Sequence, residues 1–316
     1  RYIYRVYLNN LTYNSTYQYK INMGKYESQV YNLYIPSKNK RNLKFLFFGD
    51  MGAINPVAKN QIINEVSTSK YDFMIHIGDI AYNLNTMWGF MGDWFLSQME
   101  PANSKIPYMT VPGNHENYNN FSEYKNRFSM PNFKSTKNLY YLIEHPPIKF
   151  ININTECFYF KELEPTLPIM MSFINTELYK TNRSKYPWLI VVGHRPMYCS
   201  DKDTSDCTNW KRDQIRNNLE ALFVYYNVTI YISAHEHSYE RTCPISNGIW
   251  DTSSSNYLYY KSQLNNPINI ITGAAGSIEG NNHFNNIGPK WSLVKSNKNG
   301  YGMMEVNNTH LQWKEY

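Results

Sequence analysis

Hydrophobic residues along most of the chain occur in short runs of β-branched and aromatic residues that end in glycine or polar residues. From residue 44 onward, seven such runs read KFLFFGD, DFMIHIGD, IPYMTVPGNHE, IKFININTE, WLIVVGH, VTIYISAHEH and INIITGAAG. Apolar runs of this length are typical of strands that are buried on both faces. Helices are predicted between several of them, near residues 56–68 and 88–99. The pattern therefore predicts an α/β fold in which helices cover the sheets.

The first 37 residues follow a different pattern. The stretch YRVYLNNLTYNSTYQYKI alternates apolar and polar positions around a turn, which predicts two antiparallel strands. So few strands cannot bury a core by themselves. We therefore expect residues 1–37 to be the tail of a β-sandwich that a missing segment or a partner chain completes. PSKNKRN is interpreted as a linker, and residues 38–316 are expected to form the second domain.

Composition narrows the possible classes of protein. The chain has 316 residues, of which 42% are hydrophobic, so it is long enough to bury a sizeable core. The net charge of +6 is spread without a dense basic block, which argues against a nucleic-acid partner. The same charge would favour a phosphate-bearing substrate in a positive cleft. The sequence contains no run of 18 apolar residues, so no transmembrane segment is predicted.

The cysteines and glycosylation signals favour a location outside the cytosol. Four cysteines occur without a Cys-x-x-Cys pair, which argues against a zinc–thiolate site. Cys199 and Cys207 flank a polar loop, and we predict a disulfide between them. We expect the protein to be secreted, on the cell surface, or in a lysosomal or vacuolar lumen. The candidate glycosylation sites are Asn10, Asn14, Asn120, Asn182, Asn227 and Asn307.

Side chains that can bind metals follow five of the predicted strands. In open α/β folds, ligands bind where the carboxyl ends of the strands meet. His235 and His237 are two positions apart in an extended stretch, so their imidazoles point to the same side. Turn formation could explain single residues among these, but not their joint occurrence at strand ends. The candidate ligands are Asp50, Asp79, Tyr82, Asn114, His194, His235 and His237.

The chemistry of these donors predicts two metal ions. Carboxylates, imidazoles, a phenol and an amide oxygen suit first-row transition metals. Seven donors are too many for one tetrahedral ion, but they suit two ions that share a carboxylate. Two ions about 3.5–4 Å apart can activate water and clamp a phosphoryl group. Because a phenolate favours a hard trivalent ion, Fe(III) is the expected partner of Tyr82.

The blocks GDMG, GDIAY, GNHE, VVGHRP and AHEHSYER, in this order, resemble those of the purple acid phosphatases, a branch of the calcineurin-like metallophosphoesterases. The similarity extends over residues 1–316 and is greatest to the animal-type acid phosphatases. It implies a two-sheet αββα sandwich preceded by the tail of a fibronectin-III-like β-sandwich. Tyr82 matters most for this resemblance, because the serine/threonine phosphatases do not have AY after their GD block.

The resemblance also implies a role for each residue of the site. Asp50, Tyr82 and His237 are expected to hold Fe(III), with Asp79 as the bridge. Asn114, His194 and His235 are expected to hold a divalent ion, which is zinc, manganese or iron. His115 is expected to contact the substrate phosphate or to protonate the leaving group. The substrate is therefore expected to be a phosphate ester.

Three expectations concern residues around these blocks. His76 is expected to be a hydrogen-bonded core residue, and Glu236 is expected to orient the strand end. Arg195 and Arg241 could pair with phosphate or brace neighbouring loops, and bracing is the expectation. Plant-type members place a further histidine after their GHRP-like block, where this chain has MYCSDKDTSDCTNW. Asp201, Asp203 and Asp206 cannot simply be assumed to replace that histidine.

The expected function is hydrolysis of phosphate monoesters by an acid phosphatase with an Fe(III)–M(II) centre. Two alternatives stay open on the sequence. One is a structural component of an extracellular or surface assembly, whose phosphatase centre is incidental. The other is a phosphodiesterase or nucleotide hydrolase that uses the same metals and differs in pocket shape.

Overall fold

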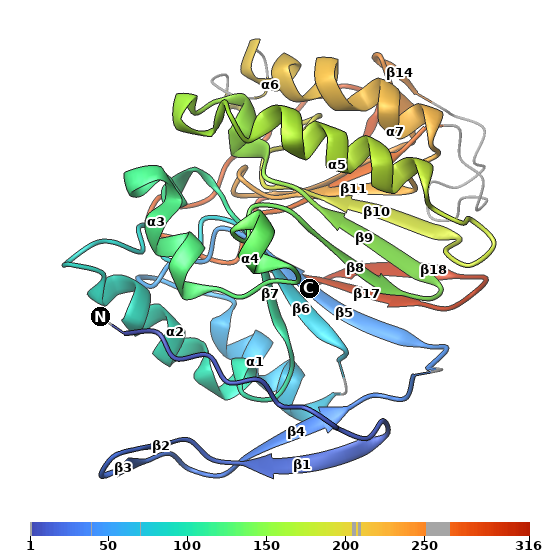
Figure 1. Cartoon of the computed structure of the whole chain (residues 1–316). Helices are drawn as coiled ribbons and strands as arrows, with labels where there is room; N and C mark the ends of the chain where they lie inside the picture. The colour runs from blue at the N-terminus through green and yellow to red at the C-terminus, as the bar shows by residue number, and fades with distance from the viewer. Residues whose placement is uncertain (1, 39, 70, 204–206, 208–209, 251–265) are drawn as a thin grey trace.

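Two mixed β-sheets stacked face to face form the centre of the molecule (Figure 1). The computed structural model describes residues 2–38, 40–69, 71–203, 207, 210–250 and 266–316. The first sheet has the order β18-β17-β5-β6-β7, with bounds Leu311–Glu315, Gly302–Val306, Leu43–Phe48, Phe73–Ile77 and Tyr108–Val111. The second sheet has the order β16-β12-β15-β11-β10-β9-β8, with bounds Ser292–Ser296, Tyr239–Thr242, Ile268–Thr272, Ile230–Ser233, Trp188–Val192, Ile148–Asn152 and Tyr141–His145.

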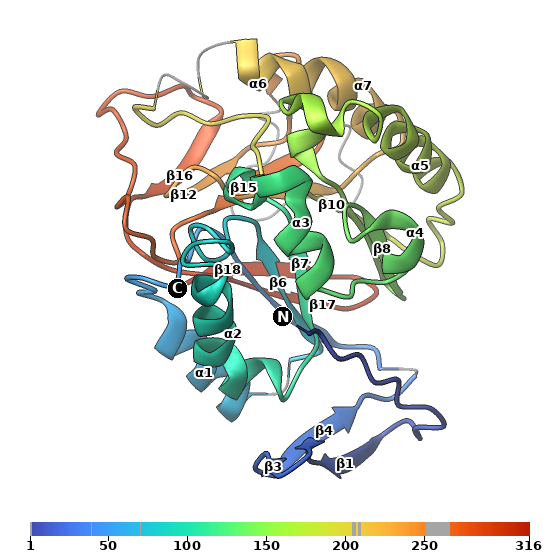
Figure 2. The ribbon, with the colours of Figure 1, turned by 60° about the vertical axis from the view of Figure 1, so that its left-hand side comes forward.

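Helices cover the outer face of each sheet, which makes the predicted αββα sandwich (Figure 2). Helices α1 (Lys59–Thr68) and α2 (Phe90–Asn103) lie on the first sheet. Helices α5 (Leu167–Tyr179), α6 (Trp210–Ile215) and α7 (Ala221–Tyr225) lie on the second. All seven predicted strands, and the helices predicted near 56–68 and 88–99, are confirmed.

The central strands are apolar throughout because they bury both faces. On β5, Phe45 and Phe47 point between the sheets, where the Phe45 ring meets the Phe150 ring edge-on at 5.2 Å. The alternate residues Leu46 and Phe48 belong to the cluster that includes the covering helices. Adjacent β5, β6 and β7 run parallel, as do β9, β10, β11 and β15. Their carboxyl ends therefore meet at one edge of the sandwich, where the site lies.

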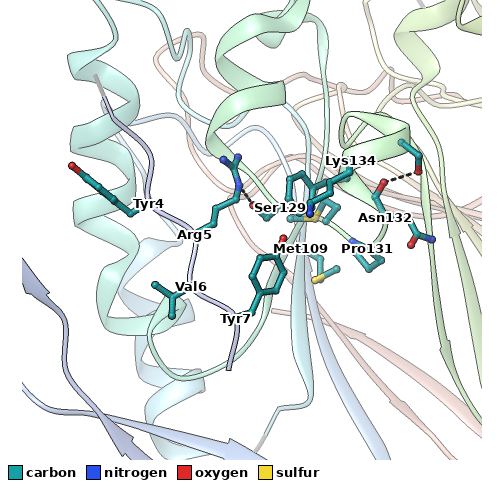
Figure 3. A pocket seen from close by; sticks show the side chains of 12 residues that line it. Tyr4, Arg5, Val6, Tyr7, Met109, Ser129, Pro131, Asn132 and Lys134 are labelled. Atoms are coloured by element: carbon teal, nitrogen blue, oxygen red, sulfur yellow. Dashed lines mark hydrogen bonds between the residues drawn. The ribbon is translucent and has the colours of Figure 1, made fainter. Parts of the chain in front are cut away.

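The N-terminal region pairs differently from the prediction. The hairpin expected within residues 4–21 is wrong, because β1 (Ser15–Tyr19) pairs with β4 (Tyr31–Ile35). Residues 2–9 form no strand; Arg5 instead donates from Nε to Ser129 Oγ at 2.6 Å (Figure 3). This contact lies in a cavity of about 950 Å³ between the N-terminal segment and residues 129–135. Alternation shows that a segment can be a strand, but it does not select the partner.

Two further expectations are neither confirmed nor contradicted. A short hairpin of β2 (Asn22–Met23) and β3 (Tyr26–Glu27) completes the strands before residue 37. That these strands are the tail of a fibronectin-III-like domain, with a boundary after residue 37, stays a prediction. Five of the six candidate glycosylation asparagines are exposed, and Asn307 is half-buried. Within the described residues, every helix is too short or too polar to cross a membrane.

Candidate metal centre

The seven predicted ligands come together from both sheets. Each of the five blocks follows the carboxyl end of a parallel strand, β5, β6, β7, β10 or β11. Asn114 is the first residue of a short 3-10 helix, Asn114–Glu116, which begins two residues after the end of β7. Five of the seven are buried and the other two, Asn114 and His235, are half-buried, as the strand ends lie inside the edge of the sandwich. Their ligand atoms form two clusters.

The first cluster contains Asp50, Tyr82 and His237. The Tyr82 hydroxyl lies 2.7 Å from His237 Nε2 and 3.4 Å from Asp50 Oδ1. Asp50 Oδ1 and His237 Nε2 are 3.6 Å apart. The other oxygen of Asp50, Oδ2, accepts a hydrogen bond from the His235 amide at 2.9 Å. These are the three residues expected to hold Fe(III), and Asp50 links them to the second cluster.

The second cluster is centred on His194. Its Nε2 lies 3.3 Å from Asp79 Oδ2, 3.2 Å from Asn114 Oδ1 and 3.2 Å from His235 Nδ1. Ligand atoms of Asp79, His194 and His235 all lie within 4.8 Å of one another, which is close enough to share one ion. Asp79 Oδ1 accepts the His115 amide at 2.8 Å. The bridging role of Asp79 stays a prediction, because its shortest ligand contact is to this second cluster.

Hydrogen bonds at the far side of two imidazoles aim their lone pairs into the site. His194 Nδ1 donates to the Ile77 carbonyl at 2.7 Å, and His237 Nδ1 donates to the Gly280 carbonyl at 2.7 Å. Both Nε2 atoms therefore present lone pairs to carboxylate, amide or phenol oxygens. Such second-side bonds fix the tautomer of metal-binding histidines. A lone pair that faces an oxygen acceptor needs a cation between the two atoms, either a proton or a metal ion, so the donor set fits metal ions.

The charges of the site also favour cations. Burial opposes a charge on His194, but the Asp79 carboxylate outweighs burial and raises the pKa of the imidazole to about 10. Burial likewise opposes a charge on His237, and Asp50 raises its pKa to about 9. For Asp79 itself, burial would raise the pKa, but the surrounding imidazoles hold it well below its usual range. These carboxylates keep their negative charge and attract positive charge, whether as protons or as metal ions.

The backbone of the ligand loops is held in an uncommon conformation. Four ligands have positive φ values, namely Asp50 (56°), Asp79 (51°), Tyr82 (46°) and His235 (70°). Non-glycine residues in this region cost about 1–2 kcal/mol each, and such positions cluster at functional sites. Glycines allow the loops to approach closely. A Cβ at Gly113 would lie 2.2 Å from Asp79 Oδ1, and one at Gly78 would lie 2.4 Å from His194 Nδ1.

His115 lies beside both clusters. Its ring packs on the Tyr82 ring with centroids 4.3 Å apart, and its side chain is 22% exposed. Nδ1 lies 2.9 Å from Asn83 Oδ1. Nε2 lies 4.0 Å from Asp79 Oδ2 and 3.5 Å from Glu279 Oε1. The imidazole is thus oriented by Asn83 at Nδ1, while its Nε2 faces two carboxylates beside the metal ligands.

Glu116 is a site residue that the sequence reasoning missed. Its carboxylate accepts three backbone N–H groups, from Asp79, Ile80 and Gly113, each at 2.9 Å. Burial and the Asp79 charge raise the pKa of Glu116 to about 8, while the amide bonds act against this rise. Glu116 thereby joins the Asp79 loop to the Asn114 loop. Glu116 is the glutamate of the GNHE block, so its position beside two predicted site residues was the feature of the sequence that pointed to it.

The expected bracing residues do brace the site. His76 is fully buried, its Nδ1 lies 2.7 Å from the Tyr108 hydroxyl, and burial lowers its pKa to about 3. Arg195 Nε donates to both oxygens of Glu156, at 2.9 and 3.0 Å, and its Nη1 donates to His235 Nε2 at 2.9 Å. Asn282 Nδ2 donates to Glu236 Oε2 at 2.7 Å.

The described part of the loop after the GHRP block contains the predicted disulfide and a buried aspartate. Cys199 and Cys207 form the predicted disulfide, with Cα atoms 5.1 Å apart. Asp201 is buried and accepts bonds from the Asp203 amide at 2.9 Å and from Asn282 Nδ2 at 3.3 Å. Its carboxylate is therefore engaged inside the loop. Asp206 lies outside the described residues.

Two protein-family models match this chain, and together they include strands of both sheets. Residues 43–239 match the family described as Calcineurin-like phosphoesterase, and residues 266–315 match Iron/zinc purple acid phosphatase-like protein C. Acid phosphatase type 7 of Danio rerio is 36% identical over 330 residues, which are 98% of this chain and 73% of that protein. Acid phosphatase type 7 of Homo sapiens is 36% identical over 323 residues, which are 98% of this chain and 72% of that protein.

A solved structure agrees with these matches. The purple acid phosphatase PPD1 from yellow lupin seeds has a TM-score of 0.78 at 26% identity. The similarity covers 96% of this chain and 58% of that chain, so this chain spans less than two thirds of the lupin protein. The calcineurin-like match includes all seven ligand positions.

Proposed function

Because this chain belongs to the purple acid phosphatase-like metallophosphoesterases and is an acid phosphatase by family, we propose that it hydrolyses phosphate monoesters at a centre of two metal ions. We propose Fe(III) for one position and zinc, manganese or iron for the other. When bound, two such ions activate water and offset the negative charge of the phosphoryl oxygens. The observation that carries the proposal is the pair of ligand clusters at the strand ends, each with facing lone pairs.

The chain's own residues divide between the two positions. Asp50, Tyr82 and His237 would hold the ferric ion, since the phenol lies 2.7 Å from the imidazole and 3.4 Å from the carboxylate. The divalent ion would be held by Asn114, His194 and His235. Asp79 would lie between the ions, and Glu116 positions it through its backbone amide.

His115 is proposed as the proton donor to the leaving alcohol. Asn83 Oδ1 accepts the Nδ1 proton, so Nε2 is the nitrogen that binds and releases the catalytic proton, and donation to the leaving alcohol occurs from the doubly protonated imidazolium. The half-buried position supports this role, because the imidazole contacts the site and is still accessible to substrate. General acid catalysis of this kind contributes about 10²–10⁴-fold in rate.

Metal analysis and phosphate release from the purified protein test the proposal together. His115→Ala should lose about 10²–10⁴-fold in kcat with alkyl phosphates, whose poor leaving groups need a proton. The loss should be much smaller with aryl phosphates of strongly acidic phenols, which leave unaided. His310→Ala, which removes an exposed imidazole in the turn between β17 and β18, is the matched control. Equal losses on both substrate types would contradict the proton-donor role.

The alternatives give different results in the same assay. Metal-loaded protein that cleaves phosphodiesters but no monoester would point to a phosphodiesterase or nucleotide hydrolase. Metal-loaded protein that cleaves neither would point to a structural role. We also propose a secreted, cell-surface or lumenal location, which the disulfide supports, since such bonds persist in oxidising compartments.

A further inference from the structure

Glu279 is an acidic residue at the mouth of the metal centre. Its Oε1 lies 3.5 Å from His115 Nε2, and its Oε2 lies 3.9 Å from His237 Nε2. The side chain is 50% exposed, whereas the carboxylates of Asp50 and Asp79 are buried. Within the described part of the chain, Glu279 makes ion-pair contacts with these two imidazoles and with no lysine or arginine. Its charge therefore faces the space that a substrate enters.

The backbone on both sides of Glu279 is tied to the site. The Ser277 amide donates to the Met51 carbonyl at 2.7 Å, and Asn55 Nδ2 donates to the Ser277 carbonyl at 2.8 Å. The Gly280 carbonyl accepts from His237 Nδ1 at 2.7 Å. Ser277 and Gly280 have φ values of 77° and 78°, which form a tight turn around Glu279. The carboxylate is thus held over the site by the fold.

In the described part of the chain, two other charged groups near the opening, Arg195 and Asp201, have partners. The guanidinium of Arg195 is buried and bonded to both oxygens of Glu156, so its charge is balanced inside the protein. Asp201 is turned into its own loop. Glu279 therefore supplies a half-exposed charge beside His115, the residue that we place next to the leaving alcohol.

We propose that Glu279 determines substrate specificity, so that the site favours phosphate monoesters of neutral or cationic alcohols over those whose alcohol carries a further negative charge. This inference rests on the proposed phosphatase function and on the placement of His115 at the leaving group. An alcohol that receives a proton from His115 Nε2 lies within a few ångströms of the Glu279 carboxylate. Two unit charges about 7 Å apart, in the partly solvated mouth of a site, change a rate constant roughly 3- to 10-fold.

The test compares three alkyl phosphates whose alcohols have similar acidity. Choline phosphate has a cationic alcohol, glycerol 1-phosphate a neutral one, and 3-phosphoglycerate an anionic one. For metal-loaded wild type we expect kcat/KM to fall in that order. In Glu279→Gln the cationic substrate loses an attraction and the anionic substrate loses a repulsion, so the ratio of choline phosphate to 3-phosphoglycerate should drop roughly 10- to 100-fold. The effect should shrink in 0.5 M salt, because the charge is solvent-accessible.

Glu305→Gln is the matched control. It removes an equal charge that pairs with Lys44, at the opposite end of β5 from Asp50. Lys44 and Asp50 are six positions apart along extended chain, about 20 Å, which exceeds the screening length at physiological salt. The ratio in this control should equal that of wild type.

Each remaining outcome counts against the proposal. If Glu279→Gln lowers kcat for all three substrates in parallel and leaves the ratio unchanged, Glu279 only positions His115 and the specificity role is wrong. If wild type hydrolyses all three and neither rate nor ratio changes in the variant, the inference fails while the phosphatase function stands. If metal-loaded wild type hydrolyses none of them, the phosphatase function and the inference both fail.

Discussion

Replacing Glu116 tests whether this buried carboxylate holds the two ligand loops together. It accepts backbone N–H groups from Asp79, Ile80 and Gly113, each at 2.9 Å, and its side chain is buried. Leaving a buried donor without a partner costs about 1–3 kcal/mol. Glu116→Ala exposes three such donors to an empty space. We therefore expect a loss of roughly 3–6 kcal/mol in the free energy of unfolding, at the lower end if water enters the space.

Glu116→Gln should have a smaller effect, for a reason that the geometry supplies. Oε2 of Glu116 serves Asp79 and Gly113, while Oε1 serves Ile80. A glutamine oxygen can keep the first pair of bonds, but its NH₂ group then faces the Ile80 N–H. One donor is lost instead of three, so the expected cost is about 1–3 kcal/mol.

The measurement is urea unfolding of metal-stripped protein at pH 9, above the pKa of Glu116, followed by tryptophan fluorescence, for wild type and both variants. Glu305→Gln is the control, because an exposed pair such as Glu305 with Lys44 contributes at most about 1 kcal/mol. Metal content after reloading is the second measurement, and both variants should hold less metal because the Asp79 loop is no longer positioned. A Glu116→Ala protein as stable as the control, with full metal, would refute the bracing role.

Two further predictions concern the ferric ligand and a carboxyl far from the metals. The metal-loaded wild type should absorb visible light through charge transfer from Tyr82 to Fe(III). Tyr82→Phe should lose this absorption band but keep the free energy of unfolding of the wild type. A colourless wild type that holds only zinc would exclude the ferric ion. Glu315 accepts from Thr272 Oγ1 and Trp313 Nε1, and burial raises its pKa from 4.5 to about 8. The folded state therefore binds this proton more tightly than the unfolded state, so its contribution to stability is full below pH 4.5 and is lost as pH rises to about 8. Metal-stripped wild type should lose ~2–4 kcal/mol more than Glu315→Gln between pH 4.5 and pH 8.5 in denaturant titrations. An equal loss in both proteins would contradict the assignment.

The sequence by itself determined the strands and the ligands, because both are local properties. A run such as KFLFFGD contains the apolar residues of β5, the glycine that allows the turn, and the ligand Asp50 within seven positions. Parallel strands place their carboxyl ends at one edge. Once the runs were recognised as parallel strands, the convergence of Asp50, His194 and His235 followed without knowledge of any side-chain contact.

The tertiary structure decided which partner each group has. Residues 4–9 and 15–19 both lie in the stretch that was predicted to form strands, yet only contacts distant in sequence showed that β1 pairs with β4 and that Arg5 contacts Ser129. Glu116 is near Asn114 in sequence, but the backbone of Asp79 that it bonds comes from another strand.

The role of Glu279 depends entirely on the tertiary structure. Nothing in GSIEGNN distinguishes it from an ordinary loop glutamate. Its position 3.5 Å from His115 depends on a turn tied to Met51, Asn55 and His237, which come from two other parts of the chain, the loop after β5 and the loop after β11. Local pattern predicts which residues can bind a metal, because that depends on each residue's chemistry and its strand. The charge that a substrate meets depends on distances through space, and only the packed structure sets those.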